Sequence, residues 1–161
     1  MSDQHITPDL IELIELLFFA YRDFISDPDQ ILAEFEFGRA HHRVLHFVTR
    51  NPGMRVTELL DILKITKQSL GRVLKQLVDE GYILQQTGPR DRRQRLLYPT
   101  DKGLALSQRL SQPQSERLAR ALSQMPKGSQ EIARQFLYLM TNENERTTVA
   151  KLAGNAKRND A

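Results

Sequence analysis

The stretch from Thr66 to Gly81, TKQSLGRVLKQLVDEG, constrains this chain more than any other part of the sequence. Thr66 is a good helix N-cap, because its hydroxyl can accept a hydrogen bond from a free N–H of the first turn. Gly81 is a good helix end, because glycine enters the left-handed conformation without steric cost. Between them the apolar side chains recur at helical spacing, at Leu70, Val73, Leu74 and Leu77. The stretch therefore predicts a helix with one narrow apolar face.

The rest of this helix surface is basic and rich in hydrogen-bonding groups. Its members are Lys67, Gln68, Ser69, Gly71, Arg72, Lys75 and Gln76. The two acidic residues of the stretch, Asp79 and Glu80, both come at its far end. A helix with an apolar back and a basic, amide-rich front suits an anionic surface, and DNA is the first candidate.

The flanking segments complete a winged helix-turn-helix pattern. Upstream, Val56–Leu63 predicts a short helix with Thr57 as its N-cap, and only three residues separate it from Thr66. Downstream, residues 82–86 and 96–98 predict two strands joined by a turn that begins at Gly88-Pro89. Four arginines lie near the tip of this hairpin: Arg90, Arg92, Arg93 and Arg95.

Charge is distributed unevenly along the 161 residues, whose net charge is +3. Residues 64–95 contain eight Lys/Arg and three Asp/Glu, whereas residues 1–40 contain two Arg and nine Asp/Glu. The basic part coincides with the predicted helix and hairpin, as expected for a nucleic-acid surface. A merely solvated basic face is the alternative, and the helix-turn-helix pattern favours DNA over it.

Composition excludes several classes of protein. The chain has no cysteine, which excludes disulfides, thiol redox sensing and cysteine–zinc sites. It has no apolar run of the ~18 residues that a membrane span needs, and its start, MSDQHITPD, lacks a signal-peptide pattern. We find no phosphate-cradling glycine loop and no nucleophile-elbow serine motif. The expectation is a single-domain cytoplasmic protein that is neither an enzyme nor a membrane partner and needs no cofactor.

The segments outside the winged pattern are predicted to be helical. Residues 10–21 contain only Glu12 and Glu15 as polar groups, which is too apolar for a surface helix. Either the rest of its own domain surrounds this helix or part of it faces another chain, and its terminal position favours the second. A long helix begins with Thr100 as N-cap, and Pro113 is expected to kink or interrupt it. The last strong helix runs from about Gln130, and the polar tail from residue 147 is expected to fray.

Three of the four histidines lie in the segment RAHHRVLHF, and His42 and His46 are four residues apart. Two histidines at this spacing can share a metal ion on one helix face. Two ligands do not make a site, however, and the chain has no cysteine to complete one. We therefore predict no metal site, and regard ordinary hydrogen-bonded or partly exposed histidines as the better interpretation.

With these elements in this order, the chain resembles the MarR (multiple antibiotic resistance regulator) family of bacterial transcription factors. The resemblance lies in VTELLDILKITKQSLGRVLKQLVDEGYI and in DRRQRLLYPTDKG. The family's wing signature is an Asp, any residue and an Arg, followed by a helix start of the L-T-x-x-G type; here these are Asp91, Arg93, Thr100 and Gly103. The order of elements matches from about residue 8 to residue 142. Pro99 and Pro113 depart from the usual pattern.

The resemblance implies a mainly α fold with a small β-hairpin, arranged as one domain over residues 1–161. A winged helix-turn-helix DNA-binding region, residues 39–100, would be flanked by helical dimerisation regions, residues 8–38 and 101–145. A homodimer would place one central helix in each major groove and each wing tip in a minor groove. Asp91 would brace the wing by pairing with a nearby arginine. Many relatives also bind small aromatic acids, and the sequence identifies no effector here.

The expected function is a sequence-specific DNA-binding transcriptional regulator, more specifically a ligand-responsive repressor acting as a homodimer on a palindromic operator. Base contacts are expected from Gln68, Ser69, Arg72 and Gln76. Other DNA contacts are expected from Arg55, Thr57, Thr66, Lys67, Lys75, Arg90, Arg92 and Arg93. Gly71 is either a site of close DNA approach or a tolerated glycine. A winged helix used for protein–protein contact, or a regulator that senses metal through His42 and His46, are the alternatives.

Overall fold

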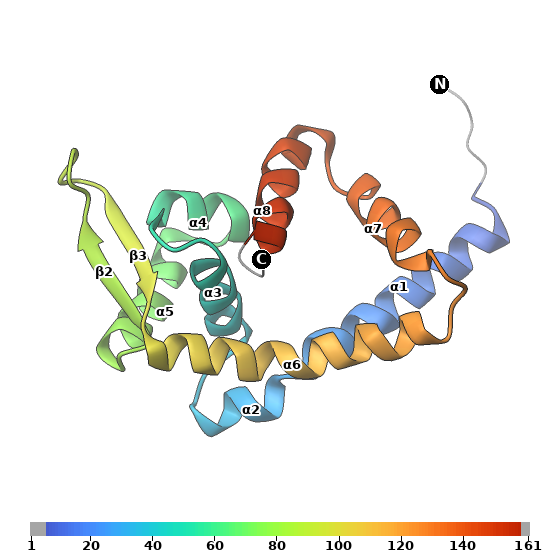
Figure 1. Cartoon of the computed structure of the whole chain (residues 1–161), viewed down its shortest axis with the longest axis horizontal. Helices are drawn as coiled ribbons and strands as arrows, with labels where there is room; N and C mark the ends of the chain where they lie inside the picture. Colours follow the sequence, from blue (N-terminus) through green and yellow to red (C-terminus); the bar gives the residue numbers. More distant parts are fainter. Residues whose placement is uncertain (1–5, 159–161) are drawn as a thin grey trace.

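The computed structural model describes residues 6–158, with side chains up to residue 154, and it is mainly α with one small sheet (Figure 1). This fold class is the one predicted. The elements are α1 (Pro8–Ser26), α2 (Asp29–Glu34), α3 (Arg39–Arg50), β1 (Met54–Arg55), α4 (Val56–Leu63), α5 (Lys67–Asp79), β2 (Ile83–Thr87), β3 (Arg95–Pro99), α6 (Asp101–Ser123), α7 (Ser129–Leu139), the 3₁₀ turn η1 (Glu143–Glu145) and α8 (Arg146–Arg158).

The sheet has three antiparallel strands in the order β1-β3-β2. The predicted hairpin is β2 and β3, in which Ile83 faces Pro99 and Thr87 faces Arg95. The sequence did not reveal β1, because two residues are too few to show an alternating pattern. β1 pairs with β3 and so joins the start of the helix-turn-helix to the wing.

One hydrophobic core connects the helix-turn-helix, the wing and the first half of α6. Its side chains with at most 2% exposure are Leu32, Val44, Leu45, Val48, Leu59, Leu70, Leu77, Ile83, Leu97 and Leu110. The core also includes Phe37. Residues 29–38 were expected from sequence to belong to a dimerisation region. They pack into the winged part instead, because Leu32 and Phe37 belong to this core.

Helix caps account for the ends of α5 and α6. The Thr66 hydroxyl accepts from the Ser69 N–H at 3.1 Å, Gly81 follows α5 at a φ of 81°, and the Thr100 hydroxyl accepts from the Gly103 N–H at 3.1 Å. These three predictions are confirmed. The prediction of Thr57 as the N-cap of α4 was wrong. The cap residue is Arg55, whose backbone N–H donates to Glu58 Oε2 at 2.8 Å, so the glutamate supplies the capping group.

Pro113 lies inside α6 without interrupting it, so of the two outcomes expected from sequence, a kink or an interruption, the interruption was wrong. The helix is continuous over 23 residues because contacts on both sides of the proline hold it against the α1–α2 corner. Arg109 bonds Glu34 at 2.8 and 3.0 Å, and Arg117 bonds Asp27 at 2.6 and 2.8 Å. These contacts offset the backbone hydrogen bond that proline cannot make.

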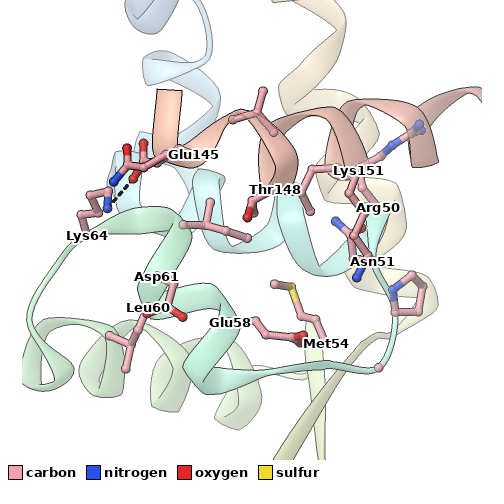
Figure 2. Close-up of a pocket in the computed structure, with 16 residues that line it drawn as sticks. Arg50, Asn51, Met54, Glu58, Leu60, Asp61, Lys64, Glu145, Thr148 and Lys151 are labelled. Carbon is pink, nitrogen blue, oxygen red and sulfur yellow. Dashed lines mark ion pairs between the residues drawn. The ribbon is translucent and has the colours of Figure 1, made fainter. Parts of the chain in front are cut away.

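Residues 147–158 of the polar tail are helical, so the expectation of fraying was wrong for this part, while residues 159–161 lie outside the described residues. α8 lies beside α4 and α3, and Glu145 just before it forms an ion pair with Lys64 at 2.5 Å (Figures 1 and 2). Val149 and Leu152 are half-buried and line pockets against α3 and α4. Two apolar residues in a polar run are a weak sequence signal, and tertiary contact rather than amphipathic pattern stabilises this helix.

α1 and α7 lie at the end of the molecule opposite the β2–β3 hairpin (Figure 1). No residue of α1 is buried. Large apolar side chains of both helices are exposed, among them Leu10, Ile11, Leu13, Ile14, Leu16, Leu17, Phe18, Phe19, Ile132, Phe136, Leu137, Leu139 and Met140. Within the described part of the chain, no helix has the length and hydropathy needed to cross a membrane.

Candidate nucleic-acid interface

The outer face of α5 consists of Lys67, Gln68, Gly71, Arg72 and Lys75, all of which are exposed. Gln68 and Arg72 are one turn apart and therefore neighbours on this face. A Cβ atom added at Gly71 would have no other atom within 4 Å, so the backbone is open to an approaching surface there. The opposite side of the helix, Leu70, Leu74 and Leu77, is buried in the core.

The cations on the outer face of α5, and Arg55 near it, differ in whether they already form an ion pair with an acidic side chain. Lys75 pairs with Asp79 at 2.6 Å, and Arg55 at the start of α4 pairs with Glu58 at 3.2 Å. Lys67 and Arg72 form no ion pair with any carboxylate in the described part of the chain. The free cations thus lie at the N-terminal half of α5, and they can bind an anion without losing a partner.

The hydroxyl groups predicted to contact DNA are mostly engaged in local hydrogen bonds. Thr66 Oγ1 donates to Ser69 Oγ at 2.9 Å while it accepts from the Ser69 N–H. Thr57 is exposed in the first turn of α4. The structure therefore brings Thr66 and Ser69 together at the start of α5, next to Lys67 and Gln68.

Gln76 differs from the other predicted base contacts. It is half-buried, and its Oε1 lies 2.8 Å from Nε2 of His41, a residue of α3. Sequence reasoning missed this partner because the two residues are 35 positions apart and neither belongs to a recognisable motif.

The wing tip is a short turn with three exposed arginines, Arg90, Arg92 and Arg93. Asp91 lies in this turn, and its carboxylate bonds the main chain of a neighbouring arginine rather than a guanidinium group. Its Oδ1 accepts from the backbone N–H of Arg93 at 2.9 Å, as short acidic side chains commonly do in turns. The turn also has no room at Gly88, where a Cβ atom would lie 2.7 Å from the Asp91 carbonyl oxygen.

The guanidinium groups of the wing tip are free of carboxylates. Arg90, Arg92 and Arg93 form no ion pair among residues 6–154, because the one nearby acid, Asp91, is occupied by the backbone. Arg95 instead donates to the Arg92 carbonyl oxygen at 3.1 Å and closes the turn. The wing therefore presents a cationic tip.

The histidines of α3 do not assemble a metal site in the part of the chain that the structure describes, where no group of three metal-ligating side chains occurs. His42 is buried and His46 is exposed, so the two differ in environment although they are one turn apart. Burial lowers the pKa of His42 to about 4, with smaller contributions from the charges of His46 and Arg43. The pKa of His46 is also lowered, by partial desolvation among the side chains around its ring and by the positive charge of Arg50.

Comparison with known proteins shows which protein family has this architecture. The model of the MarR family matches residues 36–94, which include the helix-turn-helix and most of the wing. The HTH-type transcriptional regulator PetP of Rhodobacter capsulatus is 50% identical over 108 residues. The chain belongs to the MarR family. The alignment covers 67% of this chain and 65% of PetP, just under two thirds of the length of that relative.

Solved structures of MarR proteins share the fold over most of the chain. A MarR transcriptional regulator from Methanosarcina mazei Go1 has a TM-score of 0.64 at 25% identity and covers 83% of this chain and 94% of its own. A MarR family regulator from Listeria monocytogenes, solved with a 26mer DNA, has a TM-score of 0.70 at 22% identity, with 88% and 95% covered. PetP and the Methanosarcina mazei protein are both named as transcriptional regulators, which agrees with the expectation that the chain is not an enzyme.

Proposed function

We propose that the chain is a sequence-specific DNA-binding regulator of transcription that acts as a homodimer. The observation that supports this most directly is the set of exposed cations without acidic partners, which lie on two elements, the N-terminal half of α5 and the wing tip. Phosphates attract such cations strongly and independently of sequence. The DNA complex of the MarR regulator from Listeria monocytogenes is consistent with this use of the fold.

In this proposal α5 enters the major groove and the wing reaches the minor groove. Arg72 and Gln68 read base edges, because arginine can bond guanine and glutamine can bond adenine with two hydrogen bonds each. Lys67 contacts phosphate directly, whereas Lys75 and Arg55 exchange an acidic partner for phosphate. The hydroxyl groups of Thr57 and Thr66 contact the DNA backbone, and that of Ser69 contacts a base edge. The arginines of the wing tip, Arg90, Arg92 and Arg93, suit a narrow, electronegative minor groove.

The homodimer is supported by the exposed apolar surfaces of α1 and α7. Soluble monomers rarely expose contiguous apolar patches beyond a few hundred Å². Ile14 is 64% exposed on α1 and Ile132 is 69% exposed on α7, and both helices lie at the end of the molecule away from the wing (Figure 1). A second copy that covers both helices gives a two-fold molecule, which matches a palindromic operator with half-sites about 34–36 Å apart.

We also propose that the regulator is a repressor that responds to a small molecule. A dimer on its operator excludes other proteins from the same stretch of DNA. Two pockets of about 970 and 790 Å³ flank α8, and both lie within the range of about 300–1,000 Å³ that small-molecule sites occupy. The larger one, shown in Figure 2, is lined by Lys64 of the helix-turn-helix and by Lys151 of α8. A ligand there would contact the DNA-binding part directly.

The test is selection of duplexes from a randomised DNA library by the full chain, followed by fluorescence anisotropy. We expect enrichment of an inverted repeat, bound at least about 1,000-fold more tightly than random duplex at the same salt concentration. Equal binding of selected and random duplexes would contradict sequence-specific recognition. No binding of either duplex would instead favour a winged helix used for protein contact, although the outer face of α5 offers neither apolar nor acidic groups for that purpose.

A further inference from the structure

Both nitrogen atoms of the His41 ring are used in hydrogen bonds. Nδ1 accepts from the Gly38 N–H at 3.0 Å, and Nε2 lies 2.8 Å from Gln76 Oε1. Because Nδ1 must keep its lone pair to accept, the neutral ring carries its proton on Nε2. That tautomer is the one that donates to a carboxamide oxygen. The same orientation of the Gln76 amide places its Nε2 3.5 Å from Glu80 Oε1.

The ring of His41 is also held in place from the side. It stacks on Phe37 with ring centroids 4.6 Å apart and an angle of 8° between the planes. Phe37 is 6% exposed and meets Tyr82 edge-on at 5.4 Å. Tyr82 follows Gly81 and is the second residue after the α5 C-cap Glu80. The cluster therefore contacts α5 at Gln76 and the chain just beyond its C-terminus at Tyr82.

This arrangement adds a polar contact to the buried face of α5 (Leu70, Leu74 and Leu77) in fixing how the helix is rotated about its own axis. Gln68, Arg72 and Gln76 follow one another at intervals of four residues and share one side of the helix. If Gln76 is bound to α3, the directions of Gln68 and Arg72 are set as well. A glutamine reads adenine with both amide atoms. Gln76 cannot do so while its oxygen accepts from His41.

We propose that His41 and Gln76 form a positioning pair that orients α5 on DNA, so that Gln76 is a positioning residue and not a base-reading one. This inference rests on the proposed DNA-binding function. It assigns base reading to the N-terminal half of α5, where Gln68 and Arg72 are exposed. It also gives His41, which belongs to α3, a role in affinity without contact to DNA.

The test uses the duplex that the wild-type chain selects, with four variants of the full chain. Gln76→Met keeps the side-chain volume and removes the acceptor, and His41→Phe keeps the ring and removes both nitrogens. The third variant combines these two changes. Gln68→Ala is the matched control, because it removes an exposed glutamine of the same helix. Affinity is measured on the selected duplex and on every single-base variant of one half-site.

A positioning pair predicts equal losses of about 2- to 12-fold for Gln76→Met and for His41→Phe, the value of one hydrogen bond, with no further loss in the double variant. Any change in preference among the base variants is the same in both variants, and no base position loses its preference only in Gln76→Met. Gln68→Ala, by contrast, relaxes preference at one base position. Relaxed preference in Gln76→Met with wild-type preference in His41→Phe, or losses that multiply in the double variant, would overturn the proposal.

A second measurement requires no DNA. Nitrogen-15 NMR of the free protein reports the His41 tautomer, and we expect a protected Nε2–H signal that Gln76→Met loses through exchange with solvent. An unchanged signal in Gln76→Met would overturn the proposed pair. This measurement remains informative even if His41→Phe fails to fold. If the pair is present by NMR and the wild-type chain binds no DNA, the proposed function fails and the pair is only a packing contact.

Discussion

Gly103 lies directly against the backbone of Tyr82: a Cβ atom at position 103 would be 2.1 Å from the Tyr82 carbonyl oxygen. The same carbonyl accepts from the Thr100 hydroxyl at 3.1 Å and from the Thr100 N–H at 3.1 Å. The first turn of α6 therefore packs onto the start of the wing without any intervening side chain. This contact explains physically why threonine and glycine occur together in the sequence TDKG.

Gly103→Ala should destabilise the protein, because the added methyl group forces two backbone segments apart. We expect the free energy of unfolding to fall by about 1–3 kcal/mol or more, the usual cost of overpacking a dense site. Urea denaturation monitored by circular dichroism measures this change. A midpoint equal to that of the wild type would mean that α6 can move away from Tyr82 freely.

Gly71→Ala should have the opposite effect on stability, since a Cβ atom there meets no other atom within 4 Å. Alanine is favoured over glycine inside a helix by about 1 kcal/mol, so the free energy of unfolding should rise by up to that amount. We expect weaker binding to the selected duplex, because the methyl group lies on the face turned toward DNA. Unchanged affinity together with increased stability would show that Gly71 is only a tolerated glycine.

These two glycines illustrate what the sequence could and could not predict. The caps Thr66 and Thr100 and the glycine end at Gly81 were predictable, because each depends on residues within one helical turn. The order of helix, turn, helix and hairpin followed from the same local signals. Gly71 could not be assigned from sequence, since its role depends on what surrounds it in space.

The features that the sequence missed all depend on contacts between distant segments. Pro113 remains inside a helix because Arg109 before it bonds Glu34 of α2 and Arg117 after it bonds Asp27 at the end of α1. α8 forms although its sequence is polar, with Glu145 paired to Lys64 of the helix-turn-helix. In the candidate interface the exposed cations could be foreseen from charge alone. The engagement of Gln76 by His41 could not, because no local pattern connects them.

The dimer should depend on the apolar residues of α1 and α7. Ile14→Glu and Ile132→Glu each place a charge on a surface that a second copy would bury, which is strongly unfavourable. Sedimentation velocity should show a dimer for the wild type and a monomer for both variants. Leu84→Glu is the control, because Leu84 is similarly exposed but lies on β2, and it should remain dimeric. Dimers in all three variants would place the interface elsewhere.

Stability should fall on acidification because His42 is buried as a neutral ring. Its pKa of about 4 in the folded protein is below the value of about 6.5 in an unfolded chain. The unfolded state therefore binds more protons between these two values, and the stabilising contribution, present above about pH 6.5, is lost as the pH falls toward 4. Its size is on the order of 3 kcal/mol.

This pH dependence can be isolated by substitution. His42→Leu removes the titrating group and keeps an apolar side chain in the core. Urea denaturation from pH 7 to pH 4 should show a smaller loss of stability in the variant than in the wild type. Because His46 also titrates with a lowered pKa, some dependence should persist in the variant. Identical profiles for both proteins would show that His42 is accessible to protons in the folded state.

The central claim, that the outer face of α5 and the wing tip form one DNA surface, is tested most directly by a salt series of fluorescence anisotropy on the selected duplex. For the wild type, log K should fall with log salt by about 0.9 for each phosphate neutralised. Arg72→Ala should cost ~1–3 kcal/mol and relax preference at one base position per half-site. Arg93→Ala should weaken binding with little change in that preference, since the minor groove mainly distinguishes A·T from G·C. A slope near zero, with wild-type affinity in both variants, would contradict the account.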